Sequence, residues 1–279
     1  MSDDALTSTD HSRDSAGLRY VYPVVSRRAG GVSIGINLNI NNACNWRCIY
    51  CQVPDLRLGA APPVDLIVLE EELRGFLHEV QDGDFMRRVP PEMRRLNDIA
   101  LSGNGEPTSA AEFAEVVELI GRLKPSGLKL VLITNGSLLQ REYVQRGLRR
   151  MAQLDGEVWF KLDRASEAGM ARVNDTRMTL DALRNNLATA IASCPDTWLQ
   201  TCWFALDGQP PSQRDEEDYL SFLEGAMRAG IRPRGVLLYG LARPSLQPEA
   251  PRLSALPAES MEGFAQRIRA LGVAVRISV

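Results

Sequence analysis

The stretch SIGINLNINNACNWRCIYC, residues 33–51, decides the fold because it joins a strand-like run to a tight group of cysteines. Residues 33–40 alternate polar and apolar side chains, which predicts a strand. The strand leads into a loop that carries Cys44, Cys48 and Cys51 at the spacing C-x3-C-x2-C. An odd total of five cysteines, clustered in this way, predicts metal binding or reactivity rather than disulfides.

The chain beyond this loop alternates short apolar or β-branched runs with longer amphipathic runs, a pattern typical of parallel β/α units. The predicted strands cover residues 33–40, 98–101, 128–134, 157–163, 198–204 and 235–239, with a last strand at 273–279. The predicted helices cover residues 65–80, 110–123, 140–152, 179–192, 215–229 and 258–271. Six successive β/α steps predict an α/β fold, a partial (β/α)6 TIM-like barrel.

The barrel is expected to be a single domain over residues 19–279. We expect the polar leader, residues 1–18, to be disordered, and the proline-rich residues 244–257 to form a loop before a C-terminal helix and strand. In such barrels the carboxyl ends of the strands and the loops after them form the functional face. Motifs at those positions are therefore the candidate site.

Composition narrows the classes of function. Hydrophobic residues make up 44% of the 279 residues, which suffices for a full core. The 32 basic residues are outnumbered by 35 acidic ones, and the net charge of -3 disfavours nucleic acid as a partner. The sequence has no apolar run long enough to span a membrane and no secretion signal, so we expect a cytoplasmic protein without a membrane partner. Two histidines, His11 and His78, leave little for imidazole chemistry.

Three clustered thiols leave two kinds of metal centre open. A closed structural zinc site needs a fourth ligand, and the sequence offers only the distant Cys194 and Cys202. A four-iron, four-sulfur cluster with three cysteine ligands instead leaves one iron open to bind another molecule. Two further cysteines are too few for a second cluster with four cysteine ligands.

The cysteine motif, with Tyr50 directly before its last cysteine, resembles the signature of the radical SAM superfamily. The second strand ends in SGNGEPT, residues 102–108, which is similar to the glycine-glycine-glutamate-proline segment of that family, in a variant form found near its wybutosine-synthesis-related branch. The next two strands end in TNG and KLD, which also resemble family patterns. Residues 22–28 and 239–244 resemble the same branch, and the resemblance extends over roughly residues 20–245.

The resemblance implies a barrel of the radical SAM type in which Cys44, Cys48 and Cys51 hold a [4Fe-4S] cluster. Its open iron would bind S-adenosyl-L-methionine, whose reductive cleavage yields a 5'-deoxyadenosyl radical that abstracts hydrogen from a substrate. An electron donor such as flavodoxin or ferredoxin is the implied partner. The residues expected to bind the cofactor are Tyr50, Gly103, Gly105, Glu106, Pro107, Thr134, Asn135, Lys161 and Asp163.

These assignments have physical reasons. Gly103 and Gly105 would let the backbone approach the ligand without a Cβ clash, and Glu106 would accept a hydrogen bond from the methionyl ammonium group. Lys161 and Asp163 alternate onto one strand face, where they would hold ribose hydroxyls or the carboxylate. The alternative for Lys161 and Asp163 is a structural ion pair.

Other polar side chains are expected to point into the lumen of the barrel. Cys202 shares a strand face with Gln200, so its thiol is a candidate hydrogen-atom donor to a substrate radical, the alternative being that it fills space in the core. Asn37, Asn39 and Asn41 share a face of the first strand and are expected to complete a hydrogen-bond network rather than bind a ligand.

Several substrate classes stay open. A small anionic molecule fits the acidic chain and the arginines in the branch-like segments, Arg27, Arg28 and Arg243, whereas a solvated face is the usual explanation of the basic group at residues 87–95. A peptide or protein substrate is an alternative, and branch resemblance alone suggests a tRNA base. The non-enzymatic alternative is a zinc-stabilised binding module.

Overall fold

The computed structural model describes residues 17–26 and 30–278. Its longer strands are β1 (Val21–Ser26), β2 (Gly31–Ile36), β5 (Leu96–Leu101), β6 (Lys129–Thr134), β7 (Glu157–Lys161), β8 (Thr197–Cys202), β10 (Val236–Tyr239) and β12 (Val275–Ser278). Two pairs of short strands are β3 (Ala43–Cys44) with β4 (Arg57–Leu58) and β9 (Ala205–Leu206) with β11 (Leu253–Ser254).

The α-helices are α1 (Leu66–Gln81), α2 (Phe113–Leu123), α3 (Glu142–Gln153), α4 (Glu167–Asn174), α5 (Leu180–Ser193), α6 (Gln213–Arg228) and α7 (Ala258–Ala270). Four short 3-10 helices are η1 (Phe85–Arg88), η2 (Pro91–Met93), η3 (Pro107–Ser109) and η4 (Ala250–Arg252).

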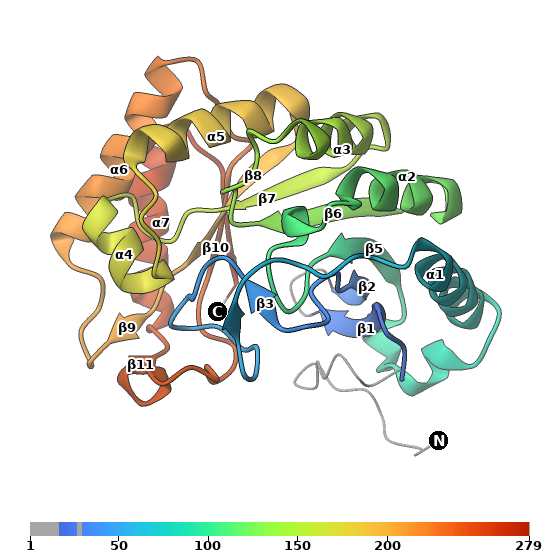
Figure 1. Cartoon of the computed structure of the whole chain (residues 1–279). Helices are drawn as coiled ribbons and strands as arrows, with labels where there is room; N and C mark the ends of the chain where they lie inside the picture. The colour runs from blue at the N-terminus through green and yellow to red at the C-terminus, as the bar shows by residue number, and fades with distance from the viewer. Residues whose placement is uncertain (1–16, 27–29, 279) are drawn as a thin grey trace.

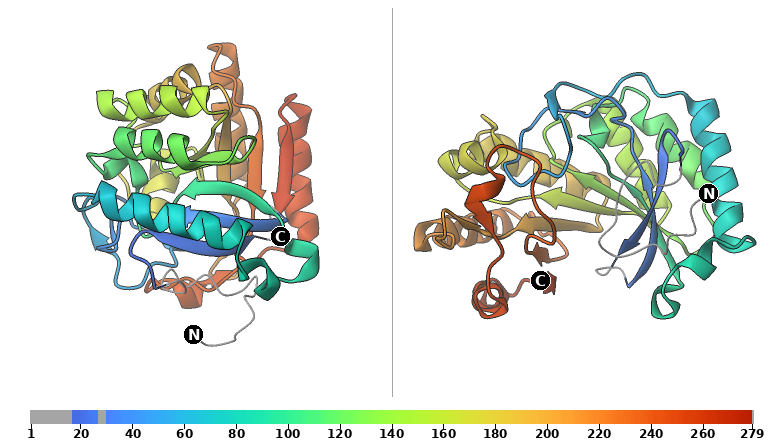
Figure 2. Two further views of the ribbon diagram at one scale, coloured as in Figure 1. Left: turned by 90° about the vertical axis from the view of Figure 1, so that its right-hand side faces the viewer. Right: turned by 90° about the horizontal axis from the view of Figure 1, so that it is seen from below.

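The longer strands form one sheet in the order β1-β2-β5-β6-β7-β8-β10-β12. Every neighbouring pair from β2 to β12 is parallel, and β1 pairs antiparallel with β2. The sheet curls around a lumen, with β1 and β12 at its two edges and the helices around its outside (Figures 1 and 2). The six β/α steps and the last strand confirm the prediction of a partial (β/α)6 TIM-like barrel.

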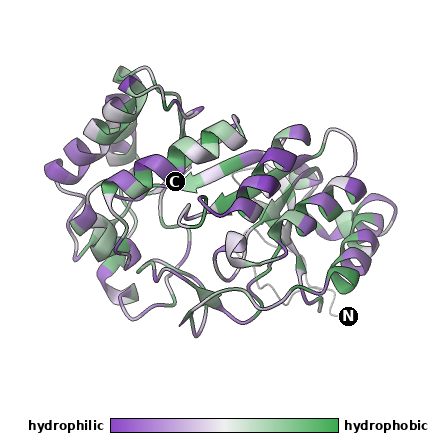
Figure 3. Cartoon of the chain, turned by 45° about the horizontal axis from the view of Figure 1, so that its top comes forward, coloured by the Kyte–Doolittle hydropathy of each residue, from purple (hydrophilic) through white to green (hydrophobic). Residues whose placement is uncertain are grey.

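The core lies between the outer face of the sheet and the helices. Side chains such as Ile34, Ile99, Leu132 and Phe160 are fully buried in one hydrophobic cluster that includes residues of all the long helices. Burying each of them contributes about 1.5–3 kcal/mol. Figure 3 shows that the helices carry hydrophilic residues along with the hydrophobic ones, as amphipathic helices on a core do. This packing leaves the inner face of the sheet free for polar residues.

Among the long strands and the α-helices, β1 and α4 were not predicted. The strand β1 lies where only a segment ahead of the first strand was expected, and its Pro23 is tolerated because β1 is an edge strand. The helix α4 was not predicted, because its eight residues include Gly169 and show little periodicity. The predicted loop at residues 244–257 contains η4 and β11.

The structure does not test the predictions of a disordered leader and of a single domain. The predicted leader falls almost wholly on residues 1–16, outside the described residues, and the single-domain prediction stays a prediction. Within the described part of the chain, no helix has both the length and the apolar character needed to cross a bilayer.

Candidate active site

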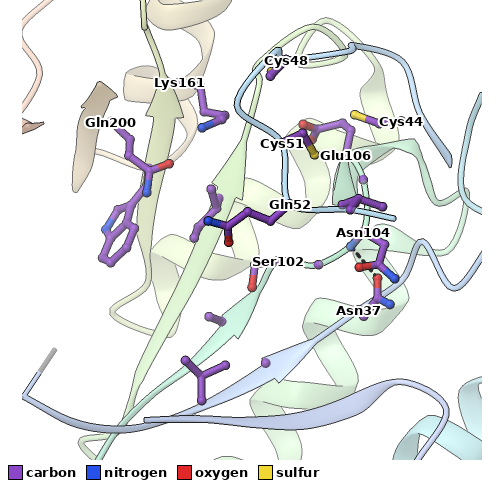
Figure 4. A pocket seen from close by; sticks show the side chains of 18 of the residues that line it. Asn37, Cys44, Cys48, Cys51, Gln52, Ser102, Asn104, Glu106, Lys161 and Gln200 are labelled. Carbon is purple, nitrogen blue, oxygen red and sulfur yellow. Dashed lines mark hydrogen bonds between the residues drawn. The ribbon is translucent and has the colours of Figure 1, made fainter. Parts of the chain in front are cut away.

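A cavity of about 1100 Å³ extends through the lumen to the carboxyl ends of the strands. Ten predicted site residues line it: Cys44, Cys48, Tyr50, Cys51, Gly103, Gly105, Glu106, Asn135, Lys161 and Cys202. Figure 4 shows the three cysteines around Glu106, with Lys161 and Gln200 on strands across the cavity. Typical small-molecule sites enclose about 300–1,000 Å³, so this cavity has room for a cofactor and a small substrate together.

The three cysteines lie on residues 41–53, which we call the cysteine loop. Each thiol is half-buried at the cavity, and pairing of β3 with β4 fixes the backbone at Cys44. Burial raises the pKa of Cys44 and of Cys48 to about 12. A metal centre would therefore have to displace a proton from each of these two thiols on binding.

The donor set fits an iron–sulfur cluster with three cysteine ligands. Within the described residues, no group of three or more cysteine, histidine or acidic side chains could hold a single metal ion. The ligated corners of a cubane cluster are separate iron atoms, so its thiols do not have to converge on one point. Soft sulfur ligands on one loop, beside an open cavity with polar groups, suit a cluster that has one free corner.

Residues far along the chain hold the cysteine loop in place. Arg47 forms a two-pronged ion pair with Glu249, with both N···O distances at 3.0 Å, and a third hydrogen bond to Asp175 at 3.1 Å. The Ser245 hydroxyl donates to the carbonyl oxygens of Ile49 at 2.8 Å and of Cys51 at 3.1 Å. The proline-rich residues 244–257 therefore serve partly as a clamp on the cysteine loop, which sequence reasoning missed.

The turn after β5 packs closely against the cysteine loop. A Cβ atom on Gly105 would lie 2.0 Å from the carbonyl oxygen of Ala43. A Cβ atom on Gly103, whose φ is +151°, would lie 2.3 Å from Oδ1 of Asn37. The glycines are thus required for contacts within the chain itself, and their approach to a ligand stays a prediction.

Glu106 is buried and held by four hydrogen bonds. Its Oε1 accepts from the backbone N–H of Thr108 at 3.1 Å and from the hydroxyls of Thr108 and Thr134, both at 2.6 Å, and its Oε2 accepts from the Asn135 N–H at 2.6 Å. Burial nevertheless raises its pKa above the ordinary value. Thr134 and Pro107 do not line the cavity; they are buried behind the carboxylate, and Thr134 helps to orient it.

Lys161 faces the cavity between two tyrosines. Its Nζ donates to the Tyr239 hydroxyl at 3.1 Å and lies 5.1 Å from the centre of the Tyr50 ring. Burial lowers the pKa of Lys161, but Tyr239, Asp163 and Cys48 raise it more, so the net shift is upward. The ammonium is therefore held in its charged form beside the cysteine loop.

Asp163 does not share the lumen with Lys161. The strand β7 ends at Lys161, so the alternation that predicted a common face stops before Asp163. Its buried carboxylate accepts hydrogen bonds from the Tyr50 hydroxyl at 2.5 Å, from Asn174 at 2.7 Å and from the backbone N–H of Cys202 at 2.8 Å. Asp163 thus positions other site residues from behind the cavity wall.

Of the other side chains predicted to point into the lumen, some line the cavity and others stabilise the surrounding chain by hydrogen bonds. Asn37 and Asn39 take part in a hydrogen-bond network, in which Asn37 Oδ1 accepts from the N–H groups of Asn39 and Asn104. Cys202 and Gln200 both line the cavity, as their shared strand face predicted. Cys202 also packs in a small apolar cluster with Ile49, Tyr50, Val173 and Phe204.

The arginines proposed for an anionic substrate are only partly described. Arg27 and Arg28 lie outside the described residues. Arg243 lines the cavity and its guanidinium group donates to Gln52 Oε1 at 3.5 Å. In the basic group at residues 87–95, Arg87 pairs with Asp84, and Arg94 donates to the Val89 and Arg87 carbonyls, so both stabilise local structure.

Sequence comparison finds partial relatives. No protein-family profile matches the chain. It is 30% identical over 155 residues to a "UPF0026 protein" of Helicobacter pylori and 27% identical over 157 residues to the "GTP 3',8-cyclase" of Nautilia profundicola. The matches cover 54% and 56% of this chain but only 44% and 38% of those proteins.

Comparison with solved structures matches most of the chain. The fold superposes on TYW1, in a structure with a lysine-pyruvate adduct bound, with a TM-score of 0.60 and 15% identity, over 85% of this chain and 73% of that one. It superposes on SuiB of Streptococcus suis bound to S-adenosylmethionine with a TM-score of 0.60 and 10% identity, over 90% of this chain and 50% of that one. At these identities, the superpositions establish a common fold.

Proposed function

We propose that this chain, a member of the radical SAM superfamily by its motifs, sequence relatives and fold, is an enzyme that cleaves S-adenosylmethionine at a [4Fe-4S] cluster held by Cys44, Cys48 and Cys51. When bound, the cluster supplies the electron that converts S-adenosylmethionine to methionine and a 5'-deoxyadenosyl radical, which then abstracts hydrogen from the substrate. The observation that carries the proposal is that the three cysteines, Glu106 and Lys161 line one cavity.

Different residues around the cavity would bind different groups of S-adenosylmethionine and of the substrate. Glu106, fixed by its four hydrogen bonds, would accept a hydrogen bond from the methionyl ammonium group on its less occupied oxygen, Oε2. Tyr50, held by Asp163, would present its ring to the adenine, and Lys161 would place a positive charge near a carboxylate or other anion. All three groups are fixed before any ligand binds, which lowers the entropic cost of binding.

We propose a small molecule with an anionic group as the substrate. Lys161 and Arg243 both line the cavity and supply cationic hydrogen-bond donors for carboxylate or phosphate oxygens. Val131 and Ile133 of β6 and Trp159 of β7 also line the cavity, and these largely apolar side chains would contact the rest of the substrate. Reduction of the cluster would come from an external carrier, for which a flavodoxin or ferredoxin is the proposed partner.

Anaerobic reconstitution with iron and sulfide tests the cluster. We expect a broad visible absorption that dithionite bleaches and that is absent from a variant with alanine at Cys44, Cys48 and Cys51. A matched variant, Cys194→Ala, removes a buried cysteine outside the cavity and should keep the absorption. A protein that takes up zinc alone under these conditions would contradict the proposal and favour a zinc-stabilised module.

Incubation of the reduced protein with S-adenosylmethionine tests the reaction. We expect slow formation of 5'-deoxyadenosine without substrate, and acceleration by a low-molecular-weight fraction of a cell extract. Acceleration only by the macromolecular fraction would argue for a peptide, protein or RNA substrate instead of a small molecule. An intact cluster that forms no 5'-deoxyadenosine would contradict the proposed reaction.

A further inference from the structure

The helix α4 ends directly against the cysteine loop. The N–H of Ile49 donates to the carbonyl oxygen of Val173 at 2.9 Å, and the N–H of Arg47 donates to that of Asn174 at 3.2 Å. The last carbonyl groups of a helix have no partner within the helix. Here the cysteine loop supplies those partners, so the end of α4 and the backbone around Cys48 are fixed to each other.

The Asn174 side chain extends this contact to a thiol. Asn174 is buried, with 1% of its surface exposed, and its Nδ2 donates to Cys48 Sγ at 3.2 Å and to Asp163 Oδ2 at 2.7 Å. An amide nitrogen has two hydrogens, so both are used. Asp163 is itself fixed by Tyr50 and by the backbone of Cys202, and it therefore fixes the direction in which Asn174 donates to sulfur.

We propose that Asn174 is a positioning residue that raises the reduction potential of the cluster through its hydrogen bond to Cys48. The proposal rests on the proposed function, because it requires a cluster with Cys48 as a ligand. One-electron reduction adds negative charge to the cluster and its thiolates, and a hydrogen bond to a ligand sulfur stabilises that charge. Asn174 thus favours the reduced state from which an electron is transferred.

Asp163 also connects Asn174 to a residue that lines the cavity. The same carboxylate oxygen, Asp163 Oδ2, accepts from Asn174 and from the Tyr50 hydroxyl. Asp163 therefore joins Tyr50, which lines the cavity, to the donor of Cys48. Tyr50, Asp163 and Asn174 thus form one hydrogen-bonded chain that ends at Cys48.

A redox titration of the reconstituted protein, monitored by electron paramagnetic resonance without S-adenosylmethionine, tests the proposal. The variants Asn174→Ala and Asn174→Leu both remove the donor, and leucine keeps a side chain of similar size. We expect both to make the midpoint potential more negative by about 59 mV, which is a tenfold change in a one-electron equilibrium. The matched variant Asn186→Ala, at a buried asparagine of α5, should keep the wild-type potential.

The outcomes separate this inference from the proposed function. Wild-type potentials in both Asn174 variants, with the cluster present, would overturn the inference alone, whereas a wild-type protein without any cluster would overturn both. If neither variant holds a cluster, the hydrogen bond from Asn174 to Cys48 is tested in wild-type protein that carries ¹⁵N in its asparagine side chains. Pulsed electron paramagnetic resonance of the reduced cluster is then expected to detect a ¹⁵N coupling, and its absence would reject the hydrogen bond.

Discussion

Glu106 receives four hydrogen bonds from three residues, so removing its carboxylate leaves buried donors without an acceptor. For Glu106→Ala we expect a loss of about 1–3 kcal/mol in the free energy of unfolding. We also expect at least about tenfold weaker binding of S-adenosylmethionine, since a hydrogen bond to a charged group contributes about 1.5–3 kcal/mol. Isothermal titration calorimetry on the reconstituted protein measures the affinity.

Thr108→Val provides the control for Glu106. It removes one hydroxyl donor to the carboxylate and leaves the other three hydrogen bonds in place. Its stability should fall slightly while its affinity for S-adenosylmethionine stays near that of the wild type. Unchanged affinity in Glu106→Ala, with an intact cluster, would remove the proposed role of this carboxylate.

Asp98 is a buried carboxyl group of β5 that lines the cavity near Ser33 and Lys129. Burial raises its pKa from 3.8 to about 6, against the lowering effect of Ser33 and Lys129. Between about pH 4 and pH 6 the folded state binds the extra proton, so stability falls as pH rises through this window and stays reduced above it. We expect Asp98→Asn to stabilise the protein by up to about 3 kcal/mol at pH 8.

Urea unfolding of the wild type and Asp98→Asn checks this pH dependence. At pH 4.5, where Asp98 of the folded wild type is mostly protonated, the two proteins should differ much less than at pH 8. An equal difference at both pH values would mean that the substitution acts through packing and not through the charge.

At the scale of elements, the contact between the turn after β5 and the cysteine loop is sensitive to one methyl group. In Gly105→Ala the new Cβ would lie 2.0 Å from the Ala43 carbonyl oxygen, so the loop has to shift. We expect the variant to fold but to take up at most half the iron of the wild type. Gly75→Ala in α1 meets nothing within 4 Å and should stabilise by about 0.5–1 kcal/mol with normal iron uptake. Iron analysis and thermal unfolding give both readouts, and full iron uptake by Gly105→Ala would contradict the expected shift.

Elements buried by their own apolar pattern are readable from the sequence. The strand β6, with Leu130, Val131 and Leu132 in a row, and α2, with apolar residues at helical spacing, were both predicted within three residues of their observed limits. The strand β1 was missed because Pro23 and its polar neighbours give no clear strand signal, and the strand is formed by pairing with β2. The helix α4 was missed because it is stabilised by contacts with the cysteine loop.

In the candidate site, too, residues that belong to a local sequence pattern were predicted and residues that act through distant contacts were not. Residues at strand ends, such as Glu106 and Lys161, were found because parallel strands bring their carboxyl ends to one face. Three contacts in or around the site were not found: Asn174 with Cys48, Tyr239 with Lys161 and Glu249 with Arg47. They join positions up to 202 residues apart in the sequence. Asn174 and Glu249 have no local pattern that marks them. Tyr239 begins a segment that resembles the family branch, but that pattern does not predict its contact with Lys161.

At the scale of the whole molecule, charge decides which large partners the half-barrel can attract. The chain has 32 basic and 35 acidic residues, and many arginines are already paired with acidic side chains, as Arg146 is with Glu115 and Arg150 with Glu118. Binding to RNA depends mainly on basic residues that neutralise phosphates and release counterions. The described surface therefore has a limited supply of unpaired positive charge for this purpose.

Filter binding with total tRNA over a range of salt concentrations measures how strongly this surface attracts RNA. We expect weak binding near physiological ionic strength and a shallow slope of log K against log salt, because few phosphates are neutralised. Removing acidic partners should raise the supply of unpaired positive charge: Glu70→Gln with Glu115→Gln frees Arg74, Arg122 and Arg146 and should steepen the slope. Tight binding by the wild type with a slope of about -3 or steeper would contradict the prediction, and would make a tRNA base the leading candidate substrate.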